Sequence, residues 1–130
     1  EQTYAEEYEA VFPKLPVTSS SYVVIVTRGH RDDMRVLKWA VTTPARYIAM
    51  IGSKRKTISV IHELEKEGLD RALFEKIFAP MGLDIGAESP EEIAISVVAE
   101  MIAARRTPES DWRSLSKSIF AHEKLRARLK

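Results

Sequence analysis

The sequence contains no cysteine among its 130 residues. Disulfide bonds, thiolate metal sites and a cysteine nucleophile are therefore excluded for this chain. No apolar run approaches the roughly 20 residues that a membrane-spanning helix needs. The acidic beginning, EQTYAEEYEAVF, does not have the pattern of a signal peptide. These absences predict a soluble, cytoplasmic protein without a membrane partner.

An excess of one charge is also missing. The 20 Lys and Arg residues nearly balance the 19 Asp and Glu residues, so the net charge does not indicate a nucleic-acid partner. Several catalytic motifs are absent as well, among them Walker A, HExxH and GxSxG. No GxGxxG motif follows an expected strand, and this absence argues against binding of NAD or NADP.

The sequence does contain short apolar runs that alternate with amphipathic segments. The runs 22–26 and 47–51 are typical of strands, and the first is expected to be buried on both faces. A shorter third strand is expected at 77–79. Apolar residues at helical spacing predict helices over 3–12, 33–41, 53–67, 70–76 and 90–105. This alternation indicates parallel strands joined by right-handed crossovers, and hence an α/β fold.

The helix at 90–105 has a well-marked beginning. Ser89 is expected at the N-cap, Pro90 at the first helical position, and Glu92 in a capping box with Ser89. Residues 106–130 change character and become polar and basic. We predict that they form a partly helical C-terminal appendage to a domain that spans residues 1–105. Its isolated apolar anchors are Trp112, Leu115, Ile119 and Phe120.

Three unusual loops follow the three expected strands. They read TRGH, GSKRK and PMGLDIGAES. In an open parallel sheet, ligands bind in the crevice beyond the carboxyl ends of the strands. We therefore expect His30, Ser53 and Asp84, one from each loop, to face a single cleft.

The GSKRK loop places three cations at the beginning of a helix. The helix dipole favours acids in that turn, so cations there lower stability unless an anion lies among them. Gly52 lets a ligand approach the backbone, and Ser53 can cap the helix or donate its hydroxyl. These features favour a phosphate or pyrophosphate site. The alternative is a solvated basic turn that meets nearby acids.

The other two loops leave their roles open. His30 can be a ligand contact, a general acid or base, or a metal ligand. A ring that is simply hydrogen-bonded to a neighbouring Asp is an equally good interpretation, and one His beside Asp32 and Asp33 does not suffice to predict a metal site. Asp84 can bind ligand hydroxyls or close its own turn. Gly82 and Gly86 are expected to adopt backbone angles that other residues resist.

Taken in order, these loops and the helices between them resemble the C-terminal Rossmann-like domain of the XdhC/CoxI family. The similarity spans roughly residues 15–105 and includes ARYIAMIGSKRK and APMGLDIGAESPEEIAISVVAEMIA. The resemblance implies a maturation factor for molybdenum hydroxylases such as xanthine dehydrogenase and carbon monoxide dehydrogenase. It would bind molybdenum cofactor and assist its sulfuration and insertion into the apoenzyme, with a cysteine desulfurase as a further partner. A cofactor-binding chaperone rather than an enzyme is thus expected. The alternatives are a dinucleotide-binding, oxidoreductase-like module and a protein-interaction module that completes a split Rossmann domain.

The resemblance also marks the loop positions at which the cofactor is expected to bind. They are Arg28, Gly29, His30 and Asp33, then Gly52, Ser53, Lys54, Arg55 and Lys56, and then Gly82, Asp84, Gly86 and Glu88. Family members carry a first βαβ unit with a GAGH-type turn, which this sequence lacks, so the three-layer Rossmann-like fold is expected to be truncated at its N-terminal half. A second copy, the helix at 3–12 or another fragment is expected to cover the strand at 22–26, and self-association is the favoured outcome.

Overall fold

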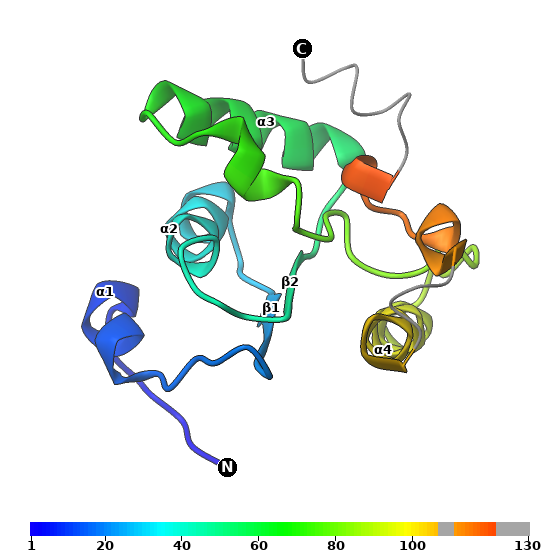
Figure 1. The fold of residues 1–130 in the computed structure, drawn as a ribbon, viewed down its shortest axis with the longest axis horizontal. Coiled ribbons are helices and arrows are strands. Elements are labelled where there is room, and N and C mark those ends of the chain that lie inside the picture. The colour runs from blue at the N-terminus through cyan, green and yellow to red at the C-terminus, as the bar shows by residue number, and fades with distance from the viewer. Residues whose placement is uncertain (107–110, 122–130) are drawn as a thin grey trace.

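The chain folds as an α/β unit in which two short strands alternate with three longer helices (Figure 1). The structure is a computed structural model that describes residues 1–106 and 111–121. Its main elements are α1 (Tyr8–Val11), β1 (Tyr22–Ile25), α2 (His30–Ala40), β2 (Tyr47–Met50), α3 (Lys54–Lys66) and α4 (Pro90–Arg106). Short 3-10 turns cover Phe12–Lys14, Arg71–Phe74, Asp111–Leu115 and Ile119–Ala121. No described helix is long and apolar enough to cross a membrane.

The two strands pair in parallel, as the sequence predicted. Tyr22 is opposite Tyr47 and Ile25 is opposite Met50. The strand expected at 77–79 is reduced to a single parallel bridge between Phe78 and Ala49 on the other edge of β2. The next donor towards β2 would be residue 80, but Pro80 has no N–H and the Met81 N–H binds Met50 O instead, so the pairing does not extend in that direction.

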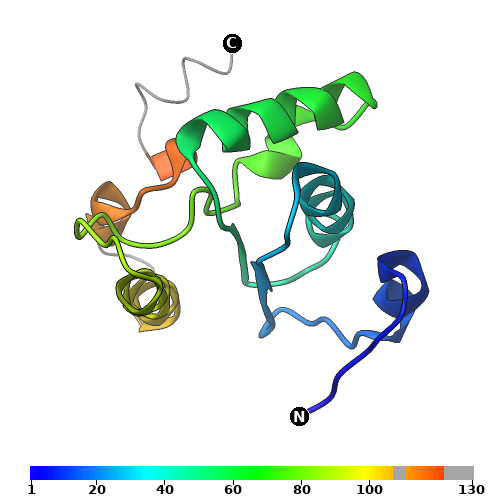
Figure 2. The same cartoon turned by 180° about the vertical axis from the view of Figure 1, so that it is seen from behind.

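Alternate side chains of β2 point into two separate cores. Ile48 and Met50 pack with residues of α2 and α3, whereas Tyr47 and Ala49 pack against Phe78 and α4. All four β2 residues are buried. Helices α2 and α3 therefore cover one face of the sheet and α4 the other, which gives the expected three layers (Figures 1 and 2).

Strand β1 is less covered than its apolar sequence suggested. Val24 is 41% exposed, and Val26, just beyond the strand, is 64% exposed. The prediction that this strand is buried on both faces is thus wrong. The Val23 and Ile25 side chains of β1 reach the core shared with α2 and α3. On the other face of the sheet, α4 covers mainly β2. Within the described residues, no strand pairs with the outer edge of β1.

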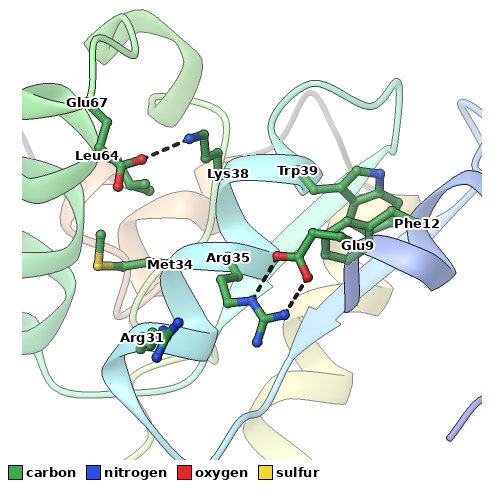
Figure 3. A pocket seen from close by; sticks show the side chains of 9 residues that line it. All are labelled: Glu9, Phe12, Arg31, Met34, Arg35, Lys38, Trp39, Leu64 and Glu67. Carbon is green, nitrogen blue, oxygen red and sulfur yellow. Dashed lines mark hydrogen bonds and ion pairs between the residues drawn. The ribbon is translucent and has the colours of Figure 1, made fainter. Parts of the chain in front are cut away.

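The N-terminal helix packs on α2 rather than over β1. The Phe12 ring stacks on Trp39 with centroids 4.4 Å apart, and Arg35 binds Glu7 at 2.8 Å and also Glu9. The hydrogen bond from Arg35 lowers the pKa of Glu9 to about 2. Figure 3 shows Glu9, Phe12, Arg35 and Trp39 among the residues that line a cavity of about 410 Å³ between the N-terminal turn, α2 and α3. The suggestion that the helix at 3–12 covers β1 is therefore wrong.

Some helices begin at other residues, or are shorter, than the sequence predicted. Helix α1 begins at Tyr8 rather than at residue 3, and the 70–76 segment forms only the short 3-10 turn. Helix α2 begins at His30, three residues earlier than predicted, because Gly29 is its N-cap. The capping box of α4 is confirmed, since Ser89 Oγ accepts from the Glu92 N–H at 3.2 Å and Glu92 accepts from the Ser89 N–H at 2.9 Å.

The described part of the C-terminal region packs into the fold. Trp112 joins the core under α4, and Ile119 and Phe120 join the core under α3. Leu115 is 58% exposed. Backbone bonds tie this segment to the loop after Phe78, including Lys117 N–H to Gly82 O at 2.9 Å. His122 lies outside the described residues.

Candidate functional site

A buried carboxylate holds the first two loops together. Asp33, in the first turn of α2, is 0% exposed. It accepts a hydrogen bond from the Thr27 hydroxyl at 2.7 Å, and its other oxygen forms an ion pair with Lys56 of α3. Thr27 Oγ1 in turn accepts from the Gly29 N–H at 3.3 Å. The TRGH loop and the GSKRK turn therefore lie side by side at the carboxyl ends of β1 and β2.

In the GSKRK turn, Ser53 has the first of the two roles that the sequence allowed, that of a helix cap. Ser53 is the N-cap of α3, and its Oγ accepts from the Lys56 N–H at 3.1 Å. Gly52 has a φ of +148°, and a Cβ at this position would come within 3.0 Å of the Lys56 side chain. A glycine here thus leaves room for Lys56 to reach Asp33.

The three cations of this turn have different environments. Lys56 is committed to Asp33, whereas Lys54 and Arg55 are exposed. Neither makes an ion pair or a side-chain hydrogen bond within the described residues. The first turn of α3 contains no acid. The turn therefore presents two uncompensated positive charges at a helix N-terminus, where an anion is stabilised.

The TRGH loop adds a third such cation and an imidazole. Arg28 is exposed and has no ion-pair partner among the residues that the structure describes. His30 is the first residue of α2 and is half-buried, and no hydrogen bond joins its ring to a neighbouring Asp there. In the described part of the chain, no group of three His, Cys, Asp or Glu side chains could hold a metal ion.

The third loop is positioned by a second buried carboxylate. Glu100 of α4 is 0% exposed and accepts from the Tyr47 hydroxyl at 2.6 Å, the Gly82 N–H at 3.0 Å and the Ser116 hydroxyl. Burial, and then the charge of Glu100, raise the pKa of the Tyr47 phenol above its usual value, so the phenol stays protonated as a donor. Glu100 thus joins the sheet, the third loop and the C-terminal segment.

Gly82 is required where this loop passes α4. Its φ is +107°, and a Cβ would come within 2.4 Å of Ser96 Oγ. The loop then turns away from the first two. Asp84 is exposed and its N–H binds Leu115 O at 2.6 Å, while the Glu88 N–H binds Glu92 at 3.0 Å. Gly86 has a φ of +72° and is exposed.

The structure therefore brings together two of the three predicted loops by direct contacts. Met81, at the beginning of the third loop, does donate to Met50 O at the end of β2. Among the described residues, however, no hydrogen bond or ion pair joins Asp84, Gly86 or Glu88 to the first two loops. A single cleft shared by His30, Ser53 and Asp84 stays a prediction.

Sequence reasoning missed Glu100 and its partners. A signal was present, because Glu100 is an acid on the same helical face as Val97 and Ile93, which point towards the sheet. An acid at such a position needs buried donors. Its donors could not be foreseen, since Tyr47 lies 53 residues before it and Ser116 lies in the segment predicted as an appendage.

Comparisons with known proteins identify relatives of this chain. A family model described as the XdhC Rossmann domain matches residues 2–101. The uncharacterized protein YqeB of Escherichia coli is 30% identical over 102 residues, which cover 78% of this chain and 18% of that protein. A protein of Bacillus subtilis described as a probable xanthine dehydrogenase subunit is 28% identical over 107 residues, which cover 78% of this chain and 30% of that protein.

A solved structure is also similar to this chain. The crystal structure of a protein described as a xanthine dehydrogenase from Bacillus halodurans aligns with a TM-score of 0.62 and 30% sequence identity. The alignment covers 78% of this chain and 29% of that chain. The chain thus spans less than a third of the length of each of these relatives.

Proposed function

Because the chain belongs to the XdhC Rossmann-domain family, we propose that it is an accessory module for the maturation of molybdenum hydroxylases. In this proposal it binds the phosphate-bearing molybdenum cofactor and assists its sulfuration and insertion into an apoenzyme of the xanthine dehydrogenase or carbon monoxide dehydrogenase type. The relatives described above as a xanthine dehydrogenase or as part of one support this class of partner. The module would hold and deliver the cofactor without chemistry of its own.

The observation that carries this proposal is the charge at the paired helix N-termini. Helices α2 and α3 both begin where a strand ends, and the Asp33–Lys56 ion pair fixes them next to each other. Around them Arg28, Lys54 and Arg55 are exposed without ion-pair partners among the described residues. This arrangement fits the terminal phosphate of the cofactor, because free N–H groups and cations stabilise the same anion.

The residues of the proposed site have separate tasks. Lys54, Arg55 and Arg28 would contact the phosphate, and Ser53 and His30 would supply hydrogen-bonding groups beside it. Asp33 and Lys56 act as positioning residues, since they satisfy each other. Gly52, Gly29 and Gly82 shape the backbone, and the remaining loop positions Asp84, Gly86 and Glu88 would lie at the far end of a larger ligand.

The composition limits how the module can take part in sulfuration. The cofactor, when bound, would supply the metal centre that is sulfurated. A persulfide carrier must be a cysteine, and these 130 residues contain none. In this proposal the sulfur would come from outside these 130 residues, with a cysteine desulfurase as the proposed donor. The chain's own contribution would be to bind the cofactor and keep it from solvent.

Removing two of the free cations should change the response to phosphate. In phosphate-free buffer, Lys54→Ala plus Arg55→Ala should leave the protein equal to or slightly more stable than the wild type, because the cations oppose the helix dipole. Added phosphate should stabilise the wild type, and its apparent Kd should be at least about tenfold weaker in the double variant, a difference of roughly 1.4 kcal/mol. Thermal unfolding at increasing phosphate concentration measures both effects.

The matched control removes the same charge at the opposite ends of the same elements. Arg46 precedes β2 and Lys66 ends α3, and both are exposed. Arg46→Ala plus Lys66→Ala should therefore respond to phosphate as the wild type does. Equal stabilisation of all three proteins would show that phosphate acts through general charge and would sink the proposed anion site.

A further inference from the structure

Helix α4 exposes a second apolar face that the fold does not use. Ile95 is 63% exposed, Val98 53% and Ile102 48%. Together with the exposed Glu91 and Arg105 they are spaced four, three, four and three residues apart. This spacing places all five on one side of the helix, in the pattern of a coiled-coil seam. We call these five residues the α4 stripe.

The surface beside the stripe is also apolar. A groove of about 400 Å³ lies between α4 and the uncovered face of β1, and its walls include Val24, Val26, Val97 and Val98. Ala94 and Ala99, which flank the stripe, are small enough to let another helix approach closely. Tyr22, next to Arg105, has a buried hydroxyl without a hydrogen-bond partner among the described residues. The uncovered face of β1 and the exposed side of α4 thus form one continuous apolar surface.

The charges at the ends of the stripe indicate what covers it. Glu91 is seven residues before Val98 and Arg105 is seven residues after it. If a second α4 packs antiparallel, with the two Val98 side chains near the two-fold axis, Glu91 of each copy lies opposite the partner's Arg105. A parallel arrangement would instead place like charges together. The stripe is therefore complementary to itself in one orientation, which is the requirement of a two-fold interface.

We propose that this surface joins two copies of the chain, which pack antiparallel along α4 with the exposed face of β1 beside the contact. The pairing buries Ile95, Val98 and Ile102 of both copies. The surface lies on the opposite face of the sheet from α2 and α3 (Figure 2). The dimer therefore leaves the GSKRK turn free.

Sedimentation equilibrium of the full chain tests this proposal. The wild type should be a dimer at tens of micromolar concentration. Val98→Glu should raise the dimer Kd at least about a hundredfold, because it places two like charges at the centre of a desolvated contact. Ile85→Glu is the control, since Ile85 is 57% exposed but lies in the third loop, away from the stripe. Circular dichroism should show all three proteins equally folded.

A charge exchange separates this interface from general hydrophobic association. Glu91→Arg alone should weaken the dimer, because two cations then face each other, and adding Arg105→Glu in the same chain should restore it. A wild type that stays monomeric at these concentrations overturns the proposal and leaves another polypeptide as the occupant. A dimer that is unaffected by Val98→Glu, or not restored by the exchange, overturns it as well.

Discussion

Replacing Glu100 with leucine should lower the free energy of unfolding by about 3–5 kcal/mol, because three buried donors lose their acceptor. These donors are the Tyr47 hydroxyl, the Gly82 N–H and the Ser116 hydroxyl. A leucine fills much of the space, so the cost arises from unsatisfied polar groups rather than from an empty cavity. Chemical denaturation of the two proteins measures the difference.

Two further variants show whether the hydrogen bonds are responsible. Glu100→Gln keeps one acceptor oxygen for Tyr47 and Gly82 and offers an N–H to the Ser116 hydroxyl, so it should cost only about 1–2 kcal/mol. Glu63→Leu changes an exposed acid of α3 and should remain within about 0.5 kcal/mol of the wild type. If Glu100→Leu were as harmless as Glu63→Leu, the Glu100 carboxylate would not join the third loop to the core.

Replacing Lys56 with methionine should lower the free energy of unfolding by about 2–4 kcal/mol, because Asp33 is left as a buried, uncompensated charge. Asp33 is 0% exposed, and among the described residues its side chain would keep only the hydrogen bond from Thr27. The expected loss of unfolding free energy is smaller than for a fully buried ion pair, because the Lys56 side chain is 30% exposed. Denaturant unfolding provides the measurement.

The neighbouring lysine is a control for the change in charge. Lys54→Met removes the same charge from the same turn, yet Lys54 is exposed and unpaired among the described residues, so its effect should stay within about 0.5 kcal/mol. Adding Asp33→Asn to Lys56→Met should recover part of the loss, because the buried position is then neutral. Equal effects of Lys54→Met and Lys56→Met would contradict the assignment of Lys56 as the partner of Asp33.

The sequence was sufficient to predict the features that depend on local spacing. The continuous apolar run at 47–51 predicted a strand, and β2 covers Tyr47–Met50 of that run. Ser89 and Glu92 predicted the capping box of α4, and Ser53 caps α3, which was one of the two roles expected for it. Each of these signals lies within a few residues of the structure that it determines, so no distant part of the chain can alter it greatly.

Features that depend on distant contacts could not be predicted in the same way. The sequence does not show which cation of the GSKRK turn forms an ion pair. Lys56 differs from Lys54 because it contacts Asp33, which lies 23 residues earlier in the chain. The apolar run at 22–26 predicted a strand buried on both faces, but the exposure of Val24 depends on where α4 lies. Local pattern therefore located the loops, whereas tertiary contacts decided which of their side chains remain free.

The most direct test of the proposed function is anaerobic binding of isolated molybdenum cofactor, measured by retention of the pterin on the immobilised chain. We expect the wild type and the Arg46→Ala plus Lys66→Ala control to retain the cofactor and not NAD. The Lys54→Ala plus Arg55→Ala variant should lose most of this binding, because it lacks both of the unpaired cations that the GSKRK turn presents among the described residues. Retention of NAD instead of the cofactor, or equal retention of the cofactor by all three proteins, would contradict the account.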